Sequence, residues 1–195
     1  MTLNPAQLPV PTKCVTPHFV LRRQQLTDNP VDYDAVMASR EELRIWSDSA
    51  WPEDTFTLEE NVEDLAMHIG EHDRDEAYGF SIFSADEAEF LGSLYVNRVA
   101  PFIDHYRADP QTVEQLNQVD ARVEYWLRRG VDHAFEVAFL AAIRAWMSQA
   151  WWFSRVAFGS RRGMHEQRGR YEAAGLTELA QLVAKEGERR FLFHT

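Results

Sequence analysis

The alternation of apolar and polar residues along the chain predicts a mixture of strands and amphipathic helices. Short runs with alternating apolar positions predict strands at residues 18–23, 78–84, 90–99, 122–127, 156–158, 179–183 and 189–193. Apolar positions three or four residues apart predict helices at residues 31–45, 58–69, 131–149 and 165–174. The order β-α-α-β-β-β-α-β-α-β-β predicts an α+β fold with a mixed sheet flanked by helices.

The segments between these elements indicate the domain boundaries. Residues 1–17 contain four prolines and no amphipathic pattern, so we expect a flexible N-terminal segment before a single domain over residues 18–195. A chain of 195 residues is long enough for one well-buried domain and short for two. Residues 101–119 are polar and contain two prolines, which predicts a long connection with one helical turn.

The composition narrows the class of protein. Hydrophobic residues make up 45% of the chain and aromatic residues 12%, which excludes a mostly disordered protein. The single cysteine, Cys14, excludes an internal disulfide and favours a reducing environment. The sequence shows no secretory signal and no run of ~18 apolar residues that could span a membrane. We therefore expect a soluble, cytoplasmic protein without a membrane partner.

Charge is distributed unevenly along the chain. The net charge of −11 argues against nucleic acid as a partner, because general affinity for phosphates requires cationic side chains. Residues 41–90 carry 16 acidic residues against two arginines, whereas residues 121–170 carry nine arginines against four acidic residues. The basic half suits a polyphosphate cofactor and the acidic half a cationic acceptor. A solvated acidic surface is the alternative interpretation of the acidic run.

A candidate anion site lies where a predicted strand meets a long apolar helix. The strand ends at Leu127, the turn Arg128-Arg129-Gly130 follows, and the helix begins near Val131. Unpaired backbone N–H groups and the helix dipole both point toward an anion bound at such a turn. A tight strand-to-helix turn, with Asp132 capping the helix, accounts for the same residues without a ligand.

The amino-acid sequence of this turn and of residues 169–176 resembles that of the GNAT acetyltransferase superfamily, in particular the branch that acetylates ribosomal-protein N-termini and small amines. Arg129, Gly130, Ala134 and Glu136 match the family's pyrophosphate loop. The resemblance covers nearly the whole chain, from Phe19 to Phe193. It implies the GNAT fold, acetyl-CoA as the acyl donor, and transfer of an acetyl group to a primary amine.

The resemblance also implies which residues bind the cofactor. They lie at the end of the strand, in the turn, at the start of the helix and in the second family segment: Trp126, Leu127, Arg128, Arg129, Gly130, His133, Ala134 and Gln167. Further arginines are candidates for the adenosine phosphates: Arg161, Arg162, Arg168 and Arg170. The turn departs from the family in being shorter and in having Asp132 in place of a glycine. A carboxylate near a pyrophosphate repels it by about 1–4 kcal/mol, so we expect weak or displaced binding.

Two residues are candidates for catalysis. Tyr171 occupies the position of the family tyrosine that protonates the CoA sulfur, and a phenol with a pKa near ~10 can donate to a thiolate. Glu124 is the candidate general base. Strand alternation places it on the same face as Arg122 and Trp126, so an ordinary ion pair with Arg122 is the alternative.

We expect an N-acetyltransferase whose acceptor is a small cationic amine or a protein N-terminus. One rival is a catalytically degenerate binding or regulatory module, because Asp132, Met164 and Gln167 replace family residues. The other is an intact fold that uses a different acyl donor or holds CoA in a displaced position. No metal site is expected, since His68 and His72 lack a nearby third ligand. Family members often form homodimers, but the sequence fixes neither the oligomeric state nor the acceptor.

Overall fold

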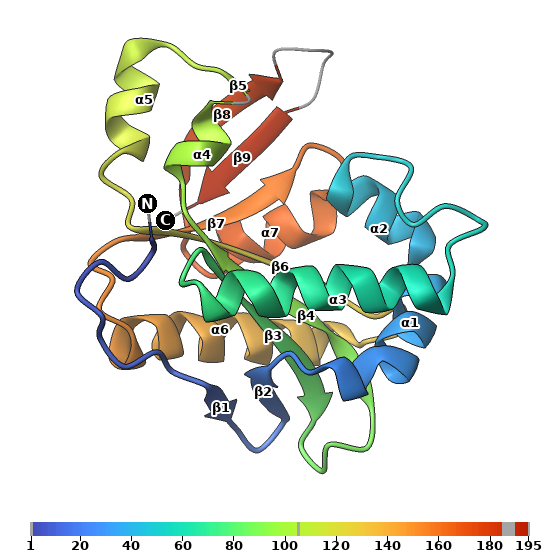
Figure 1. The fold of residues 1–195 in the computed structure, drawn as a ribbon. Coiled ribbons are helices and arrows are strands. Elements are labelled where there is room, and N and C mark those ends of the chain that lie inside the picture. Colours follow the sequence, from blue (N-terminus) through green and yellow to red (C-terminus); the bar gives the residue numbers. More distant parts are fainter. Residues whose placement is uncertain (1, 105, 185–189, 195) are drawn as a thin grey trace.

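A single nine-stranded sheet runs through the part of the chain that the computed structural model describes, residues 2–104, 106–184 and 190–194 (Figure 1). The strand order is β1-β2-β3-β4-β6-β7-β9-β8-β5. The strands are β1 (Lys13–Val15), β2 (Phe19–Arg23), β3 (Ala77–Ser84), β4 (Phe90–Asn97), β5 (Tyr106–Arg107), β6 (Ala121–Leu127), β7 (Val156–Arg161), β8 (Glu178–Ala184) and β9 (Arg190–His194). Neighbouring strands are antiparallel except β6 and β7, which are parallel.

Helices cover both faces of this sheet. They are a 3-10 turn η1 (Leu26–Asp28) and the helices α1 (Asn29–Ala38), α2 (Arg40–Ser47), α3 (Leu58–Asp73), α4 (Ala100–Ile103), α5 (Pro110–Leu116), α6 (His133–Ala150) and α7 (His165–Ala173). Helices α1 and α3 pack on β4 and β3, whereas α6 lies across the opposite face (Figure 1). The predicted α+β architecture with a mixed, mostly antiparallel sheet is confirmed.

Strand alternation on β6 divides its side chains between the two helical layers. Tyr125 packs in the same buried cluster as Phe139 of α6, with ring centroids 5.0 Å apart. Trp126 packs with Val36 of α1 and Leu43 of α2 in a second cluster on the other face. Burying large apolar side chains on both faces makes β6 a rigid central strand.

The predicted helix 31–45 is two helices, because the chain bends at Ser39. The backbone of Ser39 leaves helical geometry (φ −110°, ψ 16°). Its buried hydroxyl accepts a hydrogen bond of 2.9 Å from the backbone N–H of Arg129, 90 residues away. This tertiary contact holds the corner between α1 and α2 against the turn after β6.

Two predicted segments contain more structure than expected, and one predicted strand is described only in part. Residues 1–17, expected to be a flexible segment, include strand β1, and Leu3 is buried with its N–H donating to the carbonyl of Asp75. The expected long connection 101–119 contains α4, β5 and α5, the last capped by Asp109. The last strand, predicted from Arg189, is described from Arg190 onward, and Arg189 lies outside the described residues.

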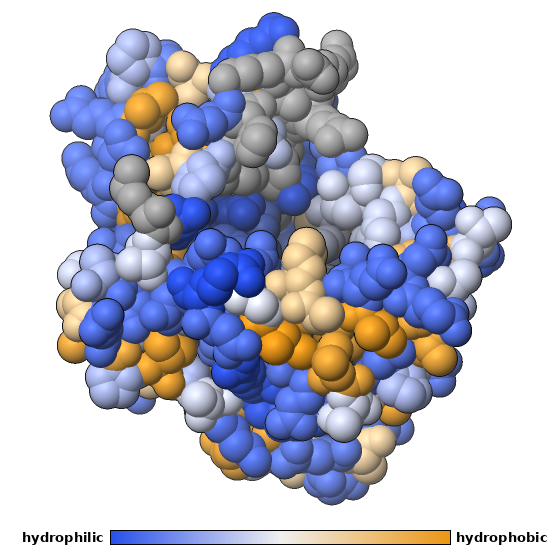
Figure 2. Space-filling model, viewed as in Figure 1, coloured by the Kyte–Doolittle hydropathy of each residue, from blue (hydrophilic) through white to orange (hydrophobic). Residues whose placement is uncertain are grey.

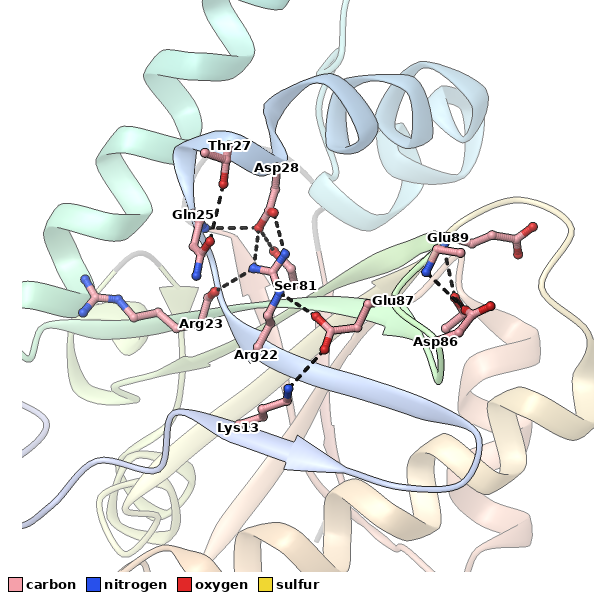
Figure 3. Close-up of polar contacts among 12 residues, drawn as sticks. Lys13, Arg22, Arg23, Gln25, Thr27, Asp28, Ser81, Asp86, Glu87 and Glu89 are labelled. Atoms are coloured by element: carbon pink, nitrogen blue, oxygen red, sulfur yellow. Dashed lines mark hydrogen bonds and ion pairs between the residues drawn. The ribbon is translucent and has the colours of Figure 1, made fainter.

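A buried ion pair joins the edge of the sheet to η1 (Figure 3). Asp28 accepts two hydrogen bonds from the guanidinium of Arg22, of 2.6 and 2.9 Å, and a third of 3.0 Å from the hydroxyl of Ser81. Arg22 also contacts Glu87 in the β3–β4 turn, which in turn binds Lys13 of β1. The network therefore connects β1, β2, β3 and the start of α1.

The outer surface of α3 is partly apolar. Figure 2 shows apolar side chains gathered over this helix, where Leu58, Val62 and Met67 are exposed. None of the helices in the described part of the chain is long and apolar enough to cross a membrane.

Candidate active site

The parallel strands β6 and β7 separate halfway along their length. They pair only from Ala121 to Val123 on β6 and from Val156 to Phe158 on β7. Beyond these residues β6 stays bonded to β4 as far as Leu127. A wedge therefore opens between the two strands, and backbone groups on its inner edges have no strand partner.

Helix α7 supplies side chains that satisfy these backbone groups. The side-chain amide of Gln167 donates to the carbonyl oxygen of Tyr125 over 3.3 Å. The hydroxyl of Tyr171 donates to the carbonyl oxygen of Gly159 over 3.3 Å. Both side chains are buried, so α7 closes the inner end of the wedge in this structure.

A cleft of about 520 Å³ continues the wedge toward the surface. This strand cleft is lined by the end of β6, the following turn, the start of α7 and part of α2. Its lining includes six of the eight predicted cofactor residues: Trp126, Leu127, Arg128, Arg129, Gly130 and Gln167. The other two lie outside it. His133 lines a neighbouring groove between α6 and α7, and Ala134 is exposed on the first turn of α6.

The turn after β6 connects this strand to α6, and a side chain caps the start of that helix. Gly130 adopts a left-handed φ of +94°, and a Cβ built there would meet nothing within 4 Å. Asp132 is the N-cap of α6, and its carboxylate accepts a hydrogen bond of 2.7 Å from the N–H of Phe135. The capping interpretation of Asp132 is therefore correct, and its negative charge stands at the helix end where an anion would bind.

Arg129 is engaged by α2 instead of pointing freely into the cleft. Its guanidinium contacts Glu41 at 2.6 Å and Glu42 at 2.7 Å. Both carboxylates raise the pKa of Arg129 further above its usual value, with Glu42 the larger contributor. These pairs are exposed, so solvent and salt screen them.

The other predicted phosphate-binding arginines differ in their partners. Arg170 pairs with Glu136 across α6 and α7 at 2.5 Å, and Arg161 binds Glu124 at 2.9 Å. Arg168 donates to the backbone oxygen of Arg162. Arg128 lines the strand cleft and makes no ion pair within the described residues.

Glu124, the predicted base, lies between two arginines. Its carboxylate contacts Arg122 at 2.8 Å and Arg161 at 2.9 Å, and Glu124 is 6% exposed. Alternation along β6 predicted the contact of Glu124 with Arg122. The contact with Arg161, which lies on β7, was not predicted. The close approach depends on Gly159, since a Cβ there would lie 2.7 Å from the Glu124 side chain. The catalytic role of Glu124 remains a prediction.

Tyr171, the predicted acid, is fully buried. Burial is the main reason that its pKa lies well above the usual value of 10, so the phenol stays protonated and is able to donate. Its hydroxyl bonds the Gly159 carbonyl, and Tyr171 is not among the residues that line the strand cleft. To donate to a sulfur atom in the cleft, the hydroxyl of Tyr171 would have to break its hydrogen bond to Gly159. The catalytic role of Tyr171 remains a prediction.

A second cavity, which the sequence did not reveal, lies on the face of β6 that carries Glu124 and Trp126. This aromatic cavity has a volume of about 300 Å³ and is enclosed by α1, α2, α3, β4 and β6. Four aromatic side chains and three carboxylates line it: Trp46, Trp51, Tyr95, Trp126, Asp32, Asp64 and Glu124. Trp46 and Trp126 also line the strand cleft, so the two spaces share a wall.

Two carboxylates in this cavity are desolvated. Asp32 is 5% exposed and accepts a hydrogen bond of 2.7 Å from Asn61, and burial raises its pKa to about 6. Asp64 accepts a bond of 3.2 Å from the indole N–H of Trp51, and burial raises its pKa too. Only one of the three carboxylates, Asp64, falls within the acidic run of residues 41–90, and the lining comes from five separate elements, so no stretch of the sequence signalled this cavity.

The described residues contain no cluster of three His, Cys, Asp or Glu side chains that could hold a metal ion. His68 instead pairs with Glu71 and lies against the ring of Tyr95, and His72 packs on Tyr78 and Phe80. The side chains gathered at this site offer hydrogen bonds and charge, in a cleft and a cavity that share Trp46 and Trp126.

A mixed sheet with a splayed parallel pair, and a turn and helix at the mouth of the splay, defines the GNAT fold. No protein-family model and no curated protein matches the sequence of this chain. Solved structures do match it over nearly its full length. Their sequence identities, below one fifth, show a shared fold and confirm the resemblance at that level.

Three solved structures illustrate the match. The ribosomal L7/L12 α-N-protein acetyltransferase RimL in complex with coenzyme A is 17% identical, with a TM-score of 0.68 over 93% of this chain and 94% of that one. The L7/L12 N-terminal serine acetyltransferase from Salmonella typhimurium is 16% identical, with a TM-score of 0.68 over 93% and 95%. The microcin C7 self-immunity acetyltransferase MccE in complex with acetyl-CoA and AMP is 12% identical, with a TM-score of 0.69 over 92% of each chain.

Proposed function

We propose that this protein is an N-acetyltransferase that moves the acetyl group of acetyl-CoA to a primary amine. One observation carries the proposal: the strand cleft and the aromatic cavity adjoin, with Trp46 and Trp126 in the lining of both. A thioester in the cleft and an amine in the cavity would approach each other at this wall. Direct transfer needs mainly this alignment of the two reactants.

The donor side of the site has groups suited to the phosphates of CoA. Gly130, in the lining of the cleft, leaves the backbone open to close approach, and α6 begins three residues later at His133. Arg128 lines the cleft without an ion pair among the described residues, so its guanidinium is available to a phosphate. The fold neighbours RimL and MccE support this placement, since their structures contain CoA and acetyl-CoA.

Transfer requires that the amine lose a proton and that the departing thiolate gain one. The amine nitrogen attacks the thioester carbonyl carbon, and the carbon–sulfur bond then breaks. Glu124 borders the acceptor side and Tyr171 borders the wedge, which supports their predicted roles as base and acid. Glu124 would act with Arg122 and Arg161 beside it, at 2.8 and 2.9 Å.

A second candidate function is a binding or regulatory module with this fold and no catalysis. The observation that favours it is the closure of the wedge by Gln167 and Tyr171, together with the charge of Asp132 at the end of α6. In that case acetyl-CoA would bind weakly or not at all. A cytoplasmic location and a homodimer also remain predictions under either function.

Calorimetric titration of the purified protein with acetyl-CoA separates the two functions. We expect a micromolar dissociation constant for the wild type, and binding weakened about tenfold by Arg128→Ala, because one charged contact is worth about 1.5–3 kcal/mol. Arg74→Ala, which removes an exposed arginine outside the cleft, is the matched control and should bind normally.

Amine-dependent release of free CoA thiol then tests for transfer itself. A panel of small amines and unblocked peptides serves as acceptors. No heat with millimolar acetyl-CoA and no thiol release with any acceptor would favour the binding module over the enzyme.

A further inference from the structure

The aromatic cavity has the features of a binding site for one compact organic cation. Its volume of about 300 Å³ lies at the lower end of the ~300–1,000 Å³ that small-molecule sites occupy. It lies under α1, α2 and α3, against the central strands β4 and β6. A ligand in it would be largely desolvated, so each of its polar groups needs a partner in the wall.

The walls are aromatic on several sides. Trp46 comes from α2, Trp51 from the loop before α3, Tyr95 from β4 and Trp126 from β6. The rings of Trp46 and Tyr95 lie 5.9 Å apart at their centroids. Indole and phenol faces attract a cation and also cover apolar carbon atoms, so these walls suit both ends of an alkyl or aryl amine.

The carboxylates in the wall are not equivalent. Glu124 is neutralised by Arg122 and Arg161, and it therefore adds little net negative charge to the cavity. Asp64 is bonded to Trp51 through one oxygen. Asp32 is likewise bonded through one oxygen, to Asn61, but it is 5% exposed whereas Asp64 is half-buried, so an ammonium group on Asp32 would be the more fully desolvated of the two.

Asn61 fixes how the carboxylate of Asp32 is presented. Its amide nitrogen donates both to Asp32, at 2.7 Å, and to the side-chain oxygen of Asn29, at 2.8 Å. Asn61 is itself 1% exposed. The amide nitrogen of Asn61 thus makes two hydrogen bonds within the protein, and it holds Asp32 in place without competing for a ligand.

We infer that the aromatic cavity binds a compact primary ammonium ion with an apolar body, and that Asp32 is the carboxylate that receives the ammonium group. The role of this ion as the acetyl acceptor rests on the proposed function, whereas its binding does not. A polypeptide N-terminus fits less well, because its first amide groups would enter a wall whose buried amide, that of Asn61, is already bonded.

Calorimetry without acetyl-CoA tests the inference directly. Benzylamine, benzyl alcohol and an unblocked tetrapeptide serve as probes at neutral pH. We expect benzylamine to bind at least tenfold more tightly than either of the others, because only it combines a charge with a compact apolar body. Equal binding of benzylamine and benzyl alcohol, or tighter binding of the tetrapeptide, would overturn the inference.

Asp32→Asn should weaken benzylamine binding about tenfold or more, since a charge-assisted hydrogen bond is worth about 1.5–3 kcal/mol. Asp34→Asn, an exposed aspartate on the same helix, carries the same charge change and should leave binding unaltered. If Asp32→Asn does not fold, Trp51→Leu removes one aromatic wall from a loop position and should also weaken benzylamine binding. Unchanged affinity in the folded variants would refute the assignment.

The two proposals fail in distinguishable ways. Asp32-dependent benzylamine binding without acetyl-CoA binding would leave the cation site standing and remove the transferase. Acetyl-CoA binding with acetylation of the tetrapeptide, but no benzylamine binding, would keep the transferase and remove the cation site.

Discussion

The side-chain amide of Gln167 donates a 3.3 Å hydrogen bond to the backbone carbonyl oxygen of Tyr125, at the point where β6 and β7 separate. This bond occupies a backbone acceptor that faces the wedge. Any ligand that enters the wedge and donates to the same oxygen must displace Gln167. The bond therefore opposes ligand binding in proportion to its own strength.

We expect Gln167→Ala to tighten acetyl-CoA binding about two- to tenfold, because a neutral hydrogen bond contributes about 0.5–1.5 kcal/mol. Calorimetric titration measures the change. Gln181→Ala, at an exposed position on β8, is the control and should not alter the affinity. Weaker binding in Gln167→Ala would mean that this amide contacts the ligand.

Asp132 caps α6, but its negative charge opposes the binding of a phosphate group at the start of that helix. Asp132→Ser keeps a side-chain oxygen to cap α6 but removes the charge, so we expect tighter acetyl-CoA binding with unchanged thermal stability. Asp132→Ala should lose about 1 kcal/mol of unfolding free energy through the missing cap. Calorimetry and urea unfolding give the two readouts. An unchanged affinity in Asp132→Ser would place the pyrophosphate away from this turn.

Removing the hydroxyl of Tyr171 leaves the buried carbonyl of Gly159 without its donor. We expect Tyr171→Phe to lower the free energy of unfolding by about 1–3 kcal/mol, measured by urea denaturation. If Tyr171 is also the proton donor, the same variant lowers kcat with little change in acetyl-CoA affinity. Full activity in the folded variant would exclude Tyr171 from proton transfer.

The Arg22–Asp28 pair should contribute more to stability than an exposed pair nearby. Asp28 is 4% exposed, and Asp28→Asn leaves the guanidinium of Arg22 without its main partner, so we expect a loss of roughly 2–4 kcal/mol. Asp73→Asn breaks the exposed Arg23–Asp73 contact and should leave the unfolding free energy nearly unchanged. Similar effects of the two substitutions would contradict this difference.

His72 should make the fold sensitive to mild acid. Burial is the main cause that lowers the pKa of His72 from 6.5 to about 4. The unfolded chain therefore takes up this proton first, and the contribution of His72 to stability is lost as the pH falls from about 6.5 toward 4. His72→Phe should flatten the fall of the melting temperature across this range.

Other groups titrate in the same range and set the control for that experiment. Asp32 acts in the opposite direction, because burial raises its folded pKa to about 6 and its contribution is lost as the pH rises. His18→Phe, at an exposed histidine, is the matched variant that carries the same change of side chain. An unaltered slope in His72→Phe would contradict the assignment.

Local patterns predicted most of the secondary structure because each depends on residues close together in the sequence. The spacing of Thr57 and Glu60 predicted the start of α3, and the structure shows a reciprocal capping box there. The break at Ser39 could not be predicted in this way, since its hydroxyl partner is the backbone of Arg129. The short edge strand β1 follows from pairing with β2 and has no clear pattern of its own.

In the candidate site, too, the sequence predicted the features that depend on neighbouring residues and missed those that depend on the fold. Alternation along β6 placed Glu124 beside Arg122, but Arg161 reaches Glu124 from a strand whose register only the fold defines. The turn at Gly130 was recognisable from its sequence, whereas the partners of Arg129 on α2 were not. The aromatic cavity draws on five elements, so no single stretch of sequence contained it.

The indole rings of Trp46 and Trp126 stand between the two spaces and belong to both. A molecule that shifts either ring from one side changes the shape of the chamber on the other. If the two chambers hold the two substrates of the proposed transferase, occupancy of the first should alter the affinity of the second, and initial-rate kinetics should show a ternary complex with coupled substrate constants. By reciprocity, each substrate would change the affinity of the other by the same factor.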